Sequence, residues 1–138
     1  GFRMFEISDL EMKATVPANR SNLDAQSEIH QGLVTNSILE LSKIYIQRQM
    51  ADKFFQFVHS EIKIVKSQKW SNGLMLNMKT SQSDLDEFFM QLHKSKRATI
   101  EFLFEISKDN TDKKKSDRFK KNDTATLKLQ IETIDLIA

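Results

Sequence analysis

The sequence contains no cysteine, one proline and three glycines among 138 residues. Without cysteine there is no disulfide framework, no thiolate metal site and no cysteine nucleophile. Glycine alone averages about 7% of a globular protein, and no P-loop, dinucleotide-binding or nucleophile-elbow motif is present. We therefore expect neither a glycine loop around a phosphate nor serine catalysis, and we predict no bound cofactor.

Long apolar runs and a strong net charge are missing as well. No stretch approaches the roughly 20 apolar residues that cross a bilayer, so no membrane segment is predicted in this chain. The formal net charge is only +2, which gives no overall attraction to nucleic acid. His30, His59 and His93 are far apart and lack metal-ligand spacing. We expect no metal site and no catalytic residues, and hence no enzyme.

The clearest secondary-structure pattern covers residues 74–137. Apolar and polar residues alternate from Leu74 as in a strand, and a helix capped by Ser83 follows. Two further strands alternate over residues 100–106 and 127–131. The apolar residues of the helix share one face: Leu85, Phe88, Phe89 and Leu92. This β-α-β-β unit predicts a two-layer α+β sandwich.

The first half of the chain predicts a strand and a long helical region. Residues 1–16 alternate in two registers, which indicates one strand with a bulge near Ser8 and Asp9. Residues 23–62 have helical apolar spacing, in two stripes that are out of phase across residues 47–49. We therefore expect a single α+β domain over residues 1–138. Its two-layer antiparallel sheet has helices on one face, is ferredoxin-like, and carries a long N-terminal helix or helix pair.

The two helical stripes predict different contacts. We assign one stripe to the protein's own sheet: Phe54, Phe55, Val58 and Ile62. We assign the other to the interface of a homodimer or to a related partner subunit: Val34, Ile38, Leu41 and Tyr45.

Two groups of charged residues are candidate sites. Asp84, Asp86 and Glu87 could be paired acids, but their place in the first turn of a helix is explained by the helix dipole. The loop of residues 108–123 is unusually long for a strand connection, and its basic residues are candidate contacts for an anionic partner: Lys113, Lys114, Lys115, Arg118, Lys120 and Lys121. This loop is either simply solvated or a surface for phosphates.

The segment from Leu74 to Arg97, with the strand that follows it, resembles the periplasmic domain of PilO-type and GspM-type proteins. In those families a strand leads into a helix of the form aspartate-leucine-x-x-phenylalanine-leucine, then into a short basic end and another strand. The matching positions here are Asp84, Leu85, Phe88 or Phe89, Leu92 and Arg97.

The resemblance covers roughly residues 52–137. It implies an inner-membrane platform component of a type IV pilus or type II secretion system, located in the periplasm and without an active site. Our leading expectation is therefore a non-enzymatic scaffold module. The alternative is a small nucleic-acid-binding or regulatory module that uses the basic residues 113–121. Without the resemblance, a cytoplasmic location is expected.

Overall fold

The computed structural model describes residues 3–51, 54–109 and 122–134. Six strands form one antiparallel sheet in the order β1-β2-β4-β5-β6-β3. The elements in chain order are β1 (Arg3–Ile7), β2 (Glu11–Val16), α1 (Gln31–Gln49), β3 (Phe55–Val65), β4 (Leu74–Lys79), α2 (Gln82–Ser95), β5 (Arg97–Lys108) and β6 (Asp123–Thr133).

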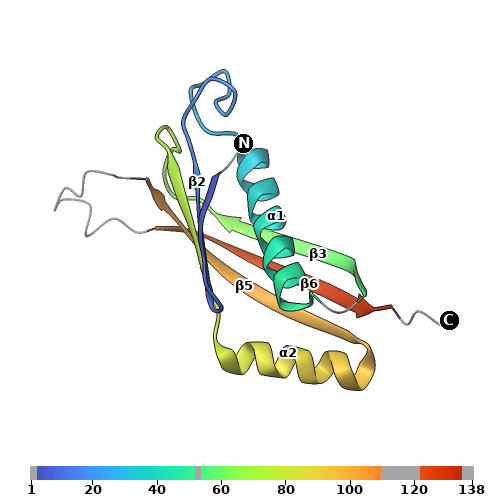
Figure 1. Ribbon diagram of the computed structural model, residues 1–138. Helices are drawn as coiled ribbons and strands as arrows, with labels where there is room; N and C mark the ends of the chain where they lie inside the picture. The colour runs from blue at the N-terminus through green and yellow to red at the C-terminus, as the bar shows by residue number, and fades with distance from the viewer. Residues whose placement is uncertain (1–2, 52–53, 110–121, 135–138) are drawn as a thin grey trace.

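One face of the sheet is the core face. Along β5 every second residue from Ala98 to Ile106 is buried and the residues between them up to Glu105 are exposed. Strand β6 also has every second residue buried, and the residues between them are half-buried except for the exposed Lys128. This alternation is typical of an antiparallel sheet that is covered on one side only. The helix α1 lies across that face (Figure 1), where the rings of Tyr45 and Phe102 meet edge to face with centroids 5.6 Å apart. Helix α2 packs against β5 with its buried residues Leu85, Phe88 and Leu92.

The predicted unit over residues 74–137 is present as β4, α2, β5 and β6. The helix begins at Gln82, slightly earlier than expected, because the side chain of Ser81, and not of Ser83, accepts the Asp84 N–H at 3.1 Å. The ferredoxin-like order is not confirmed. The sheet has six strands, and α1 connects its second strand to the edge strand β3.

The N-terminal strand prediction was wrong in one respect. Residues 3–16 form a hairpin in which Arg3 pairs with Thr15 and Ile7 with Met12. The Ser8 N–H donates to the Glu11 carbonyl oxygen at 2.8 Å and closes the turn. The change of register near Ser8 and Asp9 therefore marks a reversal of the chain and not a bulge within one strand.

The long N-terminal helix pair was also wrong. Helix α1 covers only Gln31–Gln49, and the second predicted stripe lies in or beside strand β3. A bulge between Phe57 and His59 shifts the strand alternation by one residue, so the period of two is interrupted. The helical spacing that we predicted joins residues from both faces of the strand. Phe54 and Val58 are exposed, whereas Phe55 and Ile62 are half-buried.

The predicted partner stripe of α1 is part of the protein's own core. Val34, Ile38, Leu41 and Tyr45 are each at most 1% exposed. They pack between the helix and the sheet, where burial of one such aliphatic side chain stabilises by roughly 1.5–3 kcal/mol. These four side chains therefore form no surface that a partner could contact.

Candidate functional site

The side of α1 that faces away from the core is polar. Asn36 and Glu40 are exposed, and Lys43 is half-exposed one turn further on. Residues three or four apart lie on one helix face, with roughly 5–6 Å between their Cβ atoms. We call Asn36, Glu40 and Lys43 the polar face of α1. Glu40 is the single acidic residue of this helix.

The Lys43 end of the polar face of α1 lies beside the edge strand β3. The Lys43 ammonium is 5.4 Å from the centroid of the Phe57 ring. The Phe57 ring meets that of Phe55 edge to face, with centroids 5.4 Å apart and an interplanar angle of 83°. The Lys43 ammonium thus lies beside a half-buried aromatic pair, and the Glu40 carboxylate and the Asn36 amide lie on the same helix face as Lys43. A face of this kind is a setting for a ligand with one apolar and one polar end.

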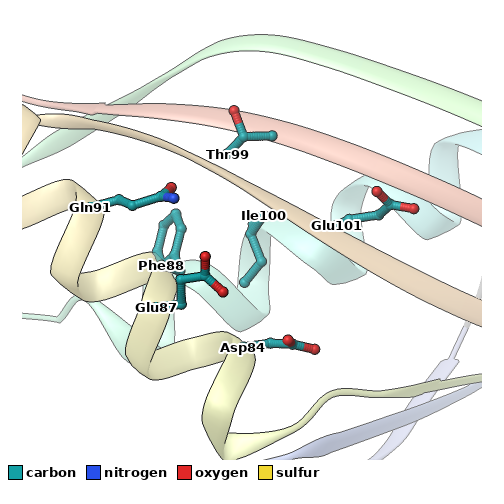
Figure 2. A pocket seen from close by; sticks show the side chains of 7 residues that line it. All are labelled: Asp84, Glu87, Phe88, Gln91, Thr99, Ile100 and Glu101. Carbon is teal, nitrogen blue, oxygen red and sulfur yellow. The ribbon is translucent and has the colours of Figure 1, made fainter.

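A pocket of about 220 Å³ lies between α2 and β5 (Figure 2). Four lining residues come from α2 and three from β5: Asp84, Glu87, Phe88, Gln91, Thr99, Ile100 and Glu101. Figure 2 shows Ile100 pointing from β5 toward α2 and Thr99 pointing to the other side of the strand. The pocket is smaller than the roughly 300–1,000 Å³ of usual small-molecule sites. Its three carboxylates make it acidic.

Asp84 and Glu87 are also the residues that we explained by the helix dipole. Asp84 does lie in the first turn of α2. The sequence did not indicate that both carboxylates would line one pocket with Glu101 of β5, because this arrangement depends on how α2 packs beside the strand.

A third polar cluster is buried and structural. The Asp123 carboxylate is 1% exposed and accepts from the Ser67 N–H at 2.7 Å, the Ser67 hydroxyl at 2.6 Å and the Trp70 indole N–H at 2.8 Å. The Lys66 ammonium lies 4.6 Å above the Trp70 ring and 3.1 Å from Glu28. The Asp123 carboxylate already accepts three hydrogen bonds, so we assign this cluster a structural role. It holds the segment before β4 against the start of β6.

The remaining sequence candidates form no site in the part of the chain that is described. Within it, no three histidine, cysteine or acidic side chains are grouped as metal ligands would be. Neither helix in those ranges is long and apolar enough to cross a membrane. The basic residues Lys113, Lys114, Lys115, Arg118, Lys120 and Lys121 lie outside the described residues.

No protein-family model matches this sequence, and no curated protein matches it either. Solved structures do resemble the fold. A Pseudomonas aeruginosa protein of unknown function, named a probable thioesterase, has a TM-score of 0.75 and 7% identity over 96% of this chain and 83% of that chain. A Haemophilus influenzae thioesterase has a TM-score of 0.62 and 8% identity over 99% and 80% of the two chains.

A third similar structure is a hypothetical thioesterase of Streptococcus pneumoniae with coenzyme A. It has a TM-score of 0.57 and 11% identity, and the match covers 100% of this chain and 89% of that chain. At these identities the likeness shows the fold alone. That fold is the hotdog fold, in which an antiparallel sheet wraps around a central helix.

This finding corrects the resemblance to PilO-type and GspM-type proteins. Several neighbours that share almost the whole fold carry thioesterase names, whereas the earlier resemblance depended on one strand-helix-strand unit. Any helix between two strands fills those matching positions with apolar residues. The expectations of a pilus or secretion scaffold and of a protein without enzymatic activity are corrected with it.

Proposed function

We propose that this protein is a thioesterase, which hydrolyses an acyl thioester to a carboxylate and a thiol. The observation that supports this proposal is the likeness over almost the entire chain to structures that carry thioesterase names. One of these structures contains coenzyme A, so acyl-coenzyme A is the substrate class to test first. A fold alone does not define a function, so particular side chains must carry the hydrolysis.

We assign the chemistry to the polar face of α1. Glu40 takes a proton from a water molecule as general base while the water oxygen attacks the thioester carbonyl carbon. The Asn36 amide, one turn earlier on the same face, donates a hydrogen bond to the carbonyl oxygen as negative charge develops there. The carbon–sulfur bond then breaks, and the thiolate leaves and is protonated. The half-buried rings of Phe55 and Phe57 provide an apolar wall for the acyl group.

The acidic pocket between α2 and β5 is a poorer place for this substrate. Coenzyme A carries several phosphate charges, which Asp84, Glu87 and Glu101 would repel. The carboxylate of Glu87 is therefore a useful control, because it is exposed on a helix like that of Glu40 but belongs to the other site.

The test is a thiol-release assay with acyl-coenzyme A substrates of increasing acyl length. Since the chain has no cysteine, a thiol reagent detects only released coenzyme A. We expect Glu40→Gln to lower kcat by roughly 10²–10⁴-fold, the usual contribution of a general base, and Glu87→Gln to leave it unchanged. Equal rates for Glu40→Gln and the native protein would overturn the assignment of Glu40, and no release from any substrate would overturn the thioesterase proposal.

We also propose that two copies of the chain pair through β3. This eleven-residue strand ends the sheet order. The Ile134 N–H donates to the Phe54 carbonyl oxygen at 2.8 Å, so even-numbered residues of β6 bond to β3. Glu61 and Lys63 lie opposite the even-numbered Lys128 and Thr126. On the C-terminal side of the bulge, the N–H and C=O groups of Ile62, and of every second residue counted from it, therefore point away from β6.

The sequence of β3 complements itself about Ile62. If Ile62 pairs with the partner's Ile62 in an antiparallel ladder, Glu61 faces the partner's Lys63, and Lys63 faces the partner's Glu61. These are non-hydrogen-bonded pairs, whose side chains are the closer ones, and each opposite-charge pair contributes roughly 0.2–1 kcal/mol. The homodimer that we predicted at α1 is therefore proposed at the edge strand β3 instead.

A cytoplasmic location stays a prediction.

A further inference from the structure

Lys43 brings a positive charge to the polar face of α1. It follows the Glu40 carboxylate by three residues and the Asn36 amide by seven. At a rise of 1.5 Å per residue, Lys43 lies about 4.5 Å beyond Glu40 along the helix axis. In the hydrolysis proposed above, the thioester carbonyl is beside Asn36 and Glu40, so Lys43 is the next side chain of this face beyond the reacting carbon.

The contacts of Lys43 place it at the acyl end of the substrate. Its ammonium nitrogen is 5.4 Å from the centroid of the Phe57 ring, and this ring meets that of Phe55 edge to face. These two half-buried rings are the apolar wall that we assigned to the acyl group. The acyl group and the thiol lie on opposite sides of the thioester carbon, so the coenzyme extends away from Lys43.

The Lys43 ammonium has hydrogen-bonding capacity to spare. An ammonium group carries three N–H donors. Among the residues that the structure describes, Lys43 forms no ion pair, not even with Glu40, and its one contact of this kind is the Phe57 ring. Lys43 is also half-buried, and a charge that is partly shielded from water attracts an anion more strongly than a fully solvated one.

The position of Glu40 sets the length of a substrate that could use this charge. Glu40 repels a carboxylate that is close to the thioester carbon, because like charges at short range disfavour each other. A carboxylate therefore has to pass Glu40 before it reaches Lys43. Three or four carbon–carbon bonds of about 1.5 Å each are enough for that span.

We propose that Lys43 selects thioesters whose acyl group ends in a carboxylate, with about five carbons in the acyl group. The carboxylate accepts hydrogen bonds from the Lys43 ammonium, and the methylene groups between the two ends of the acyl group lie against Phe55 and Phe57. Lys43 binds the substrate and takes no part in the proton transfer at Glu40. This inference rests on the thioesterase proposal and names its substrate class.

The test compares glutaryl-coenzyme A with pentanoyl-coenzyme A, which differ by a carboxylate in place of a methyl group. Thiol release without protein is subtracted. We expect kcat/KM of the native protein to be about tenfold higher or more for the glutaryl thioester, since hydrogen bonds to charged groups are the stronger ones. Most of this preference should lie in KM, because the carboxylate is held in the ground state and the transition state alike.

Three variants locate the preference. Lys43→Met should abolish the ratio of the two kcat/KM values, and Lys43→Arg should keep most of it. The ratio within one variant cancels any effect of the substitution on Glu40 or Asn36. Lys94→Met removes an exposed lysine from α2 and should keep the ratio, which controls for the change in net charge.

A carrier without phosphates separates the acyl carboxylate from the coenzyme as the anion that Lys43 binds. The same two acyl groups on N-acetylcysteamine should show the same preference and the same loss in Lys43→Met. If Lys43→Met instead slows both coenzyme A thioesters equally and neither N-acetylcysteamine thioester, Lys43 binds a phosphate and the inference is wrong. Thiol release without a preference for the glutaryl group would overturn this inference alone, whereas no release from any substrate would overturn the thioesterase proposal with it.

Discussion

Tyr45 links the central helix to the N-terminal hairpin through one hydroxyl group. The hydroxyl donates to the Asp9 carbonyl oxygen in the turn between β1 and β2. Burial, and then the negative charge of Asp9, raise the pKa of Tyr45 from 10.0 to about 12. Between these pH values the unfolded chain loses the proton and the folded protein keeps it, so stability that is present below pH 10 is lost as the pH rises toward 12.

The prediction at this scale is that Tyr45→Phe removes this alkaline loss and costs about 1 kcal/mol at neutral pH through the missing hydrogen bond. Urea unfolding of both proteins at increasing pH measures the difference, and the comparison cancels the titration of the lysines. Tyr45 is the single tyrosine, so ultraviolet absorbance of tyrosinate reports its pKa directly. A tyrosinate midpoint near the value for a free tyrosine would contradict the burial of this hydroxyl.

At the scale of elements, the Asp123 carboxylate holds the segment before β4 to the start of β6. Asp123→Ala leaves three donors on Ser67 and Trp70 without their acceptor. We expect a loss of about 3 kcal/mol in the free energy of unfolding, since a hydrogen bond to a charged group contributes more than a neutral one. Trp70 is the single tryptophan, and its fluorescence follows the local change. Asp123→Asn keeps one acceptor oxygen and should cost less; equal stability of all three proteins would show that the cluster contributes nothing.

The elements differ in how far the sequence predicted them. Strands β4, β5 and β6 and helix α2 were predicted because their apolar periodicity is uninterrupted. The first part of strand β3 was predicted as a helix because the bulge between Phe57 and His59 breaks its alternation. The stripe from Val34 to Tyr45 was correctly placed on a helix but given to a partner, because a sequence does not show which surface an apolar stripe meets.

The candidate sites also differ in how far the sequence could have predicted them. Asn36 and Glu40 could have been found as the face opposite that stripe, once the stripe is assigned to the core. The pocket at β5 could not, because it exists only where β4 ends opposite Leu103 and leaves the longer strand unpaired. Register between strands is a long-range property that local periodicity does not contain.

For the molecule as a whole, the edge strand β3 decides how two copies of the chain can pair. This strand is long and has Val58 and Val65 exposed. An uncovered strand edge of this kind tends to pair with another chain. We expect a dimer in solution. Lys63→Glu places a carboxylate opposite the partner's Glu61 twice in each dimer, so the dimer should dissociate at a protein concentration roughly tenfold higher or more. Light scattering across protein concentration measures this shift.

The double variant with Glu61→Lys and Lys63→Glu separates this register from other arrangements. It exchanges the two charges, so each pair across the proposed axis is again opposite and the dimer should return. Within one chain Glu61 lies opposite Lys128, so the exchange costs some stability in the monomer and cannot restore the dimer by strengthening the fold. A dimer that resists Lys63→Glu, or a double variant that stays monomeric, would contradict pairing about Ile62. A native protein that is monomeric at every concentration would contradict the proposed homodimer.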